Sequence, residues 1–154
     1  MVVGASPTEI AMTKTEHIIE MMIEKTRELL ICRRHLVTHA TSAKNKEHRT
    51  IRLQLPRQSG QTQSVLTSVK SYFSKPLFIC GTQNNIKILK EFKHNCSLVT
   101  RRSAIEGEAL VGRDFDCVII DNASLIKQED IDKIYNNLEP VSALHDNFLF
   151  ILIG

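Results

Sequence analysis

From residue 51 onwards, short apolar runs alternate with segments of helical periodicity, and this alternation constrains the fold most strongly. Five runs have the length and the β-branched or aromatic content of buried strands. They are Ile51–Leu55, Leu77–Cys80, Ser97–Thr100, Cys117–Asp121 and Phe148–Ile153. Because strands that alternate with helices form parallel βαβ units, the pattern predicts an α/β domain with a mainly parallel sheet of about five strands.

The segments between these runs carry apolar residues at the spacing of a helix face. Three helices are predicted, with apolar positions at Val65, Leu66, Val69, Tyr72 and Phe73, at Ile86, Leu89 and Phe92, and at Ile131, Ile134, Tyr135 and Leu138. The first is expected to end before Pro76 and the third at Pro140, because proline interrupts a helix.

A long helix is predicted before this domain. Ser6-Pro7-Thr8-Glu9 has the serine, proline and glutamate of a helix start, and Thr13–Glu16 offers a second start. The helix is expected to fade near Ala40 and to be followed by a polar linker, Thr41–Arg49. The expected organisation is therefore a helix and linker over 1–49 and an α/β domain over 50–154.

One face of the long helix is predicted to pack on the sheet domain or on a second copy of the chain, as in a homo-oligomer. An exposed apolar stripe of that length would otherwise be an interaction site. The face consists of Ile18, Met22, Leu29, Cys32 and Leu36, which recur at helical spacing.

Composition excludes some classes of protein. The chain has 154 residues, 42% of them hydrophobic and 24% charged, which is typical of one globular domain. No apolar run approaches the roughly 20 residues that span a bilayer. Glu9, Lys14 and Glu16 interrupt any signal-peptide-like segment, and the four cysteines have no CxxC spacing. We expect an intracellular, cytoplasmic protein, within a host cell if it is viral, with no membrane partner.

Basic residues gather in one stretch although the net charge is only +3. Lys44, Lys46, Arg49, Arg52 and Arg57 are opposed there only by Glu47. The stretch is either an electrostatic footprint for phosphate groups or a solvated linker face.

The segment Leu55–Thr62 follows a predicted strand and opens a predicted helix. In a P-loop, G-x-x-x-x-G-K followed by Ser or Thr, backbone N–H groups surround a phosphate, the lysine offsets its charge and the hydroxyl binds Mg²⁺. Gly60 and Thr62 match this pattern, whereas Leu55 replaces the first glycine and Gln61 replaces the lysine. The alternative is a strand-to-helix turn without a ligand.

A second motif is Cys117–Ser124, an apolar strand that ends in an acid. It fits a Walker B element in which Asp121 holds Mg²⁺. The next position, which is often the glutamate that activates water, is Asn122, and an amide cannot take the proton. The alternative is an ordinary buried strand ending in Asp-Asn.

Together these segments resemble the ATPase domain of viral large terminases, the DNA-packaging motors. Pro56–Thr62 resembles their RQxGKT loop, and Val111–Ser124 resembles the RGxxxDxxIIDEA approach to their Walker B strand, with Val111 where arginine is common. Leu77–Phe92 resembles the strand and helix that follow the P-loop in terminases and helicases. The resemblance covers about residues 50–154.

The resemblance implies a three-layer P-loop NTPase-like domain in which the last strand lies between the Ile51–Leu55 and Cys117–Asp121 strands. Asp121 would meet the metal, and the residues at the nucleotide would be Arg57, Gln58, Ser59, Gly60, Gln61 and Thr62. The implied cofactors are ATP and Mg²⁺, bound weakly or not at all, because Gln61 carries no charge. The implied partners are nucleic acid, DNA in particular, and the proteins of a packaging or helicase machine.

Three functions follow as hypotheses. The first is a binding or regulatory module in viral DNA packaging or nucleic-acid handling, because Gln61 and Asn122 together remove the phosphate clamp and the base. The second is a slow ATPase of terminase or helicase type, in which Arg57 or Lys70 replaces the missing lysine. The third is a structural interaction domain that uses the N-terminal helix.

Other residues have both a functional and an ordinary interpretation. One helix face carries three residues that could bind a metal, Cys32, His35 and His39, and His48 could be a fourth ligand. We favour the alternative, an ordinary helix face with polar residues at its edges. Arg101-Arg102 either contacts phosphate or ends a strand. Asp130 and Asp132 are expected to be solvated.

Overall fold

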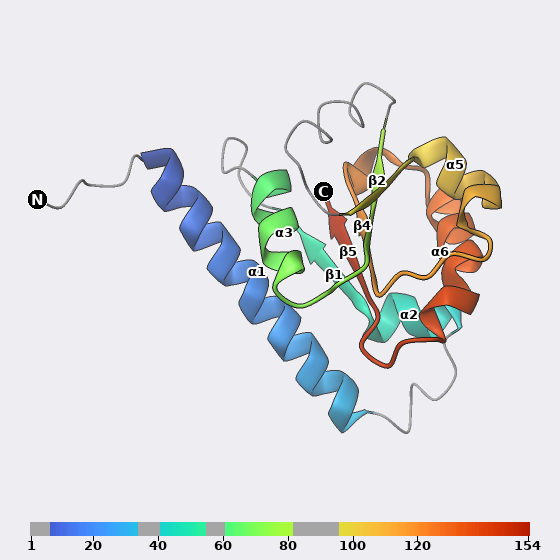
Figure 1. Ribbon diagram of the computed structural model, residues 1–154, viewed down its shortest axis with the longest axis horizontal. Coiled ribbons are helices and arrows are strands. Elements are labelled where there is room, and N and C mark those ends of the chain that lie inside the picture. Colours follow the sequence, from blue (N-terminus) through green and yellow to red (C-terminus); the bar gives the residue numbers. More distant parts are fainter. Residues whose placement is uncertain (1–6, 34–40, 55–60, 82–95) are drawn as a thin grey trace, which may run out of the picture.

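The structure is a computed structural model that describes residues 7–33, 41–54, 61–81 and 96–154. It has α/β architecture, with a five-stranded sheet between two helical layers (Figure 1). The strands are β1 (Thr50–Leu53), β2 (Pro76–Cys80), β3 (Ser97–Thr100), β4 (Cys117–Ile120) and β5 (Leu149–Ile153). The helices are α1 (Pro7–Cys32), α2 (Ser42–His48), α3 (Gln61–Lys70), α5 (Arg101–Glu106), η2 (Glu108–Leu110), η3 (Ala123–Leu125) and α6 (Gln128–Ser142).

The sheet is parallel throughout and has the strand order β1-β5-β4-β2-β3. The last strand therefore lies between β1 and β4, as predicted, with Ile151 opposite Ile51 on one side and Ile119 on the other. Because all strands run the same way, the segments that follow them emerge at one edge of the sheet. Asp121, which follows β4, belongs to that edge.

One face of the sheet packs against α1 and α3, which lie side by side on it in Figure 1. The two helices contribute Ile19, Ile23, Leu30, Val65, Leu66 and Val69 to the buried cluster, and the turn after α3 contributes Phe73. The strands contribute alternate residues: Ile51, Leu53, Phe78, Cys80, Cys117, Ile119, Leu149, Ile151 and Ile153. We call this face of the sheet the α3 face.

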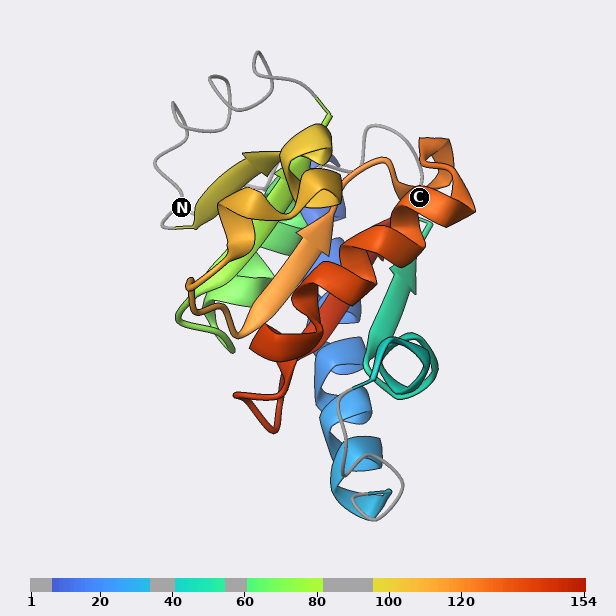
Figure 2. The same cartoon turned by 90° about the vertical axis from the view of Figure 1, so that its right-hand side faces the viewer.

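The opposite face packs against α6 and α5, which Figure 2 shows in front of the sheet. Tyr135 of α6 stacks on Phe150 of β5, with 4.2 Å between ring centroids. The strand residues of this second cluster are Leu77, Ile79, Val99, Val118, Ile120, Phe150 and Leu152. Each strand thus presents alternate side chains to the two cores, as a doubly covered parallel sheet requires. We call this face the α6 face.

Helix α1 packs on the domain, but not with the predicted face. Its buried positions are Ile19, Ile23 and Leu30, whereas Ile18 and Leu29 are 47% and 49% exposed. Met22 is half-buried, and Leu36 lies outside the described residues. For packing on the domain, the prediction chose the wrong one of two neighbouring apolar stripes, because the isoleucine and leucine pairs at 18–19 and 29–30 place an apolar residue in each stripe. The alternative, that the predicted face packs on a second copy, stays a prediction. The helix also ends at Cys32 rather than near Ala40.

The predicted polar linker is partly a helix. Thr41 caps α2, and the Asn45 side chain donates a buried hydrogen bond of 3.0 Å to the Ser142 hydroxyl. Lys46 pairs with Asp132, and Ser42 bonds to Glu139. Polar contacts with α6 hold this helix in place. It therefore has no apolar stripe, and the hydrophobic pattern of the sequence could not reveal it.

Helix α6 passes through Pro140 and ends at Ser142, contrary to the prediction. Pro140 is exposed, so the carbonyl group that loses its N–H partner is free to be hydrated. Beyond the proline, the buried Val141 and Ser142 anchor the last turn, and the Ser142 hydroxyl donates to the Glu139 carbonyl at 2.8 Å.

The remaining helix prediction, around Ile86–Phe92, falls outside the described residues. Among the helices of the described ranges, none has the length and apolar character needed to cross a membrane.

Candidate functional site

The predicted phosphate loop is described only at its end. Arg57, Gln58, Ser59 and Gly60 lie outside the described residues, as does Leu55. Gln61 and Thr62 form the start of α3, whose Val65, Leu66 and Val69 are buried on the sheet. The strand-to-helix connection that a phosphate loop requires is therefore present, and α3 begins near the carboxyl edge of the sheet.

Asp121 follows β4 at that same edge, and strand alternation assigns it to the α3 face. Cys117 and Ile119 belong to the α3-face core, whereas Val118 and Ile120 belong to the other. The electrostatics agree, because the pKa of Cys80, an α3-face residue, is raised to about 11 by burial first and by the Asp121 charge second. The carboxylate and the start of α3 thus share one edge and one face.

Asp121 makes one hydrogen bond through its backbone and one through its carboxylate. Its backbone N–H donates to the Ile79 carbonyl at 3.0 Å, and its Oδ1 accepts the Asn122 N–H at 3.0 Å. Burial raises the pKa of Asp121, while the Asn122 N–H and the charge of Arg101 act in the opposite direction. Partial burial strengthens electrostatic interactions at this carboxylate, and the Arg101 charge already offsets part of its negative charge.

Asn122 occupies the position where the Walker B pattern has its glutamate. Its φ and ψ of 51° and 42° are left-handed, a conformation that asparagine tolerates better than most residues with a side chain. The side chain is exposed. An amide here cannot accept a proton from water, so the described geometry supplies no general base at this position.

Arg101 is a site residue whose role the sequence left open. Thr100 caps α5 by accepting the Ser103 N–H at 3.2 Å, so Arg101 is the first residue of that helix. It lies at the carboxyl end of β3, and its charge is felt at Asp121. Its Nε is buried and has no hydrogen-bond partner in the described part of the chain. Arg102, by contrast, is exposed and pairs with Glu106 at 3.0 Å.

Lys70 does not replace the missing lysine. It is the last residue of α3, and nine residues at 1.5 Å each place it about 13 Å along the helix from Gln61. It therefore lies toward the opposite edge of the sheet, where its charge is felt at Cys96, just before β3. Of the two proposed substitutes only Arg57 remains, and it lies outside the described residues.

The residues present fit Mg²⁺ only together with a phosphate. Asp121 offers the hard oxygen ligand that Mg²⁺ prefers, and protein sites commonly add one or two carboxylates to phosphate oxygens and water. The described ranges hold no cluster of three or more His, Cys, Asp or Glu side chains. Cys32 is exposed, and the other two members of the predicted metal trio, His35 and His39, lie outside these ranges.

The basic stretch is divided by the fold. Lys46 is paired with Asp132, and Arg49 is buried, donating to the Asp146 and Phe148 carbonyls at 2.9 and 3.2 Å. Asp132, which was expected to be solvated, is thus the ion-pair partner of Lys46. Burial lowers the pKa of the Arg49 guanidinium. Of the described members of the stretch, Lys44 and Arg52 are left for other partners.

Sequence comparison adds no relative. No protein-family model matches this chain, and a search of curated proteins finds no match.

Proposed function

We propose that this chain is a degenerate P-loop domain, resembling the ATPase domain of terminases and helicases, that acts as a binding or regulatory module in viral DNA packaging or nucleic-acid handling. The observation that supports it is the placement of Asp121 and the start of α3 on one face at one edge, with β5 between their strands. In this proposal Asp121 would hold Mg²⁺, which would neutralise phosphate charge, and Gly60, Gln61 and Thr62 would contact the phosphates.

The same geometry favours binding over turnover. Arg101 supplies a positive charge beside Asp121, but no cation among the described residues takes the place of the loop lysine, because Lys70 is too distant. Charge-assisted hydrogen bonds are roughly twice as strong as neutral ones, so Gln61 weakens phosphate binding without abolishing the backbone contribution. Asn122 removes the base, so hydrolysis suffers more than binding. The slow ATPase is the second candidate, in which Arg57 serves as the phosphate cation.

Calorimetric titration with Mg²⁺–ATP and a separate assay of phosphate release test this proposal. We expect weak binding that Gln61→Lys strengthens, and that Asp121→Asn and Arg101→Gln each weaken. Arg102→Gln is the matched control, because this neighbouring arginine faces solvent and its loss leaves binding unchanged. Phosphate release is expected at background in the native chain.

Two results would count against the proposal. Turnover of about 1 per second or faster, which is ordinary for an enzyme, would favour the ATPase. Failure of Gln61→Lys to bind Mg²⁺–ATP would mean that Leu55–Thr62 is a turn without a phosphate site.

A further inference from the structure

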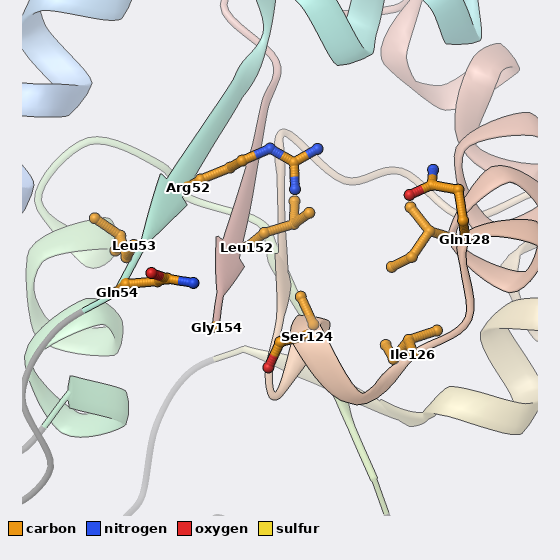
Figure 3. A pocket seen from close by; sticks show the side chains of 10 residues that line it. Arg52, Leu53, Gln54, Ser124, Ile126, Gln128, Leu152 and Gly154 are labelled. Atoms are coloured by element: carbon orange, nitrogen blue, oxygen red, sulfur yellow. The ribbon is translucent and has the colours of Figure 1, made fainter.

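A pocket lies on the other side of the sheet from Asp121, where β1 and β5 end and the chain between η3 and α6 passes over them (Figure 3). Its volume is about 570 Å³, within the range of roughly 300–1,000 Å³ that small-molecule sites occupy. Arg52 alternates with Ile51 and Leu53, which point into the α3-face core. Its side chain, like that of Leu152, therefore belongs to the α6 face.

Among the described residues of the lining, Arg52 is the one basic residue and none is acidic. Its guanidinium makes no hydrogen bond or ion pair within the described part of the chain, and Figure 3 shows it extended across the upper side of the pocket. A guanidinium presents five N–H donors in a rigid fork that matches phosphate or carboxylate oxygens. The pocket therefore offers a binding position for one anionic group.

The rest of the lining suits a ligand that has an apolar surface and polar groups around its margin. Leu152 and Ile126 form an apolar surface, and Gln54, Gln128 and Ser124 stand around it in Figure 3. The Gln128 amide nitrogen donates to Asp132 at 2.9 Å, which leaves its carbonyl oxygen as an acceptor for a ligand amine. Gln54 adds a donor and an acceptor, and Ser124 adds a hydroxyl.

Gly154 helps to place one of these groups. Its N–H donates to the Leu53 carbonyl at 2.8 Å, which continues the pairing of β1 and β5 to the pocket. A Cβ at this position would come within 2.9 Å of Gln54 Cγ. The absence of a side chain at 154 therefore lets the Gln54 side chain lie across the end of β5.

We propose that this pocket binds a nucleoside monophosphate unit, either as a free mononucleotide or as one unit of a single-stranded nucleic acid, with Arg52 on the phosphate and the glutamines on the base. One phosphate matches the single guanidinium, and a purine presents both an apolar surface and a margin of donors and acceptors. Glutamine is a known partner of the adenine amine and ring nitrogen. The proposed ligand contacts, Arg52, Gln54 and Gln128, include neither Asp121 nor the start of α3, so the site stands independently of the nucleotide site proposed above.

Calorimetric titration of the full chain tests this inference, with adenosine monophosphate, a single-stranded oligoadenylate, adenosine and inorganic phosphate as probes. We expect one of the two phosphate-bearing nucleotide probes to bind, and whichever binds more tightly per site identifies the source. Arg52→Gln should weaken that binding about 10-fold to 100-fold, as expected for a hydrogen bond to a charged group. Arg102→Gln should leave it unchanged, and circular dichroism checks that each variant is folded.

Each alternative result overturns the inference. Absence of binding by both nucleotide probes at millimolar concentration would do so, as would binding that survives Arg52→Gln. Inorganic phosphate binding as tightly as adenosine monophosphate would show a simple anion contact, and adenosine binding as tightly would show that Arg52 holds no phosphate. Binding lost with Asp121→Asn but retained with Arg52→Gln would assign the nucleotide to the α3 face instead.

Discussion

The backbone N–H of Asn122 donates to the Asp121 carboxylate at 3.0 Å while Asn122 itself is in the left-handed region, with φ of 51°. The two features are linked, because this backbone turn directs the N–H back toward the preceding side chain. Any attempt to restore the base by placing glutamate at 122 must therefore accept the left-handed conformation or lose the contact that holds Asp121.

The first prediction concerns the stability of such a variant. Asn122→Glu should lower the free energy of unfolding by about 1 kcal/mol, since side chains other than asparagine are strained there. Asn122→Gly should be neutral or slightly stabilising, because glycine adopts φ above 0° freely. Urea unfolding measures both. Equal stability of the two variants would mean that the left-handed turn carries no strain. Because Asn122→Glu is expected to be destabilising, the double variant Gln61→Lys with Asn122→Glu should be assayed for nucleotide binding below its own midpoint temperature.

Arg49 is predicted to be a structural residue rather than a phosphate contact. It is 6% exposed, and its guanidinium holds the turn before β5 through the Asp146 and Phe148 carbonyls. Arg49→Met keeps the apolar stem but leaves those buried acceptors without a partner, so unfolding should become easier by about 2–3 kcal/mol. Arg102→Met, at an exposed ion pair, should change stability by less than about 0.5 kcal/mol. A similar small loss for both variants would return Arg49 to the list of binding candidates.

The strands were predictable because burial on both faces makes them continuous apolar runs. Ser97–Thr100 is confirmed residue for residue, and Cys117–Asp121 differs from β4 by one. Helices α2 and α5 were missed because they are short and polar, and their caps and side-chain bonds come from contacts such as Asn45 with Ser142. Thr100 is a residue type favoured at an N-cap, and using it as a helix start would have placed Arg101 at the carboxyl edge.

The site was predictable to the extent that it follows from strand alternation. A period of two places Asp121 on the same face as Cys117 without any structure, and the structure identifies that face as the one covered by α3. The α6-face pocket was not predictable, because Arg52, Ser124 and Gln128 come from three separate segments that only the β1–β5 pairing and the η3–α6 turn bring together. For the same reason, the sequence alone could not show that Lys46 and Arg49 are taken up by internal partners.

Acid sensitivity is predicted at the opposite edge of the sheet. The hydrogen bond from His145, with 2.5 Å between the two atoms, and a second one from Lys75 hold the pKa of Asp114 below its usual range. A carboxyl group with a lowered folded-state pKa stabilises the fold above its unfolded pKa, about 3.9, and this contribution is lost as the pH falls through the folded value. Asp114→Asn should therefore reduce stability near neutral pH.

The difference between the native chain and Asp114→Asn should shrink as the pH falls below about 4. Urea unfolding at a series of pH values measures it. Glu108→Gln is the control, because this exposed carboxylate has no ion pair or hydrogen bond from its side chain in the described ranges. A difference that stays constant down to pH 2 would mean that Asp114 acts through packing rather than through its charge.

The final prediction decides which stripe of α1 belongs to the core. Ile23 is fully buried between α3 and the sheet, whereas Ile18, five residues earlier on the same helix, is about half exposed. Truncating a buried isoleucine removes apolar contact and leaves a cavity, so Ile23→Ala should lower the free energy of unfolding by about 2–5 kcal/mol. Ile18→Ala should cost less than about 1 kcal/mol, because most of the lost surface is already in water and alanine is the better helix former. The two variants remove the same atoms from the same helix, so helix propensity cancels between them. Urea unfolding gives the stabilities, and sedimentation gives the mass in solution. If Ile18→Ala proved the more damaging and also changed the mass, the stripe with Ile18 and Leu29 would be an interface with a second copy, and the face first predicted from the sequence would be the one that matters.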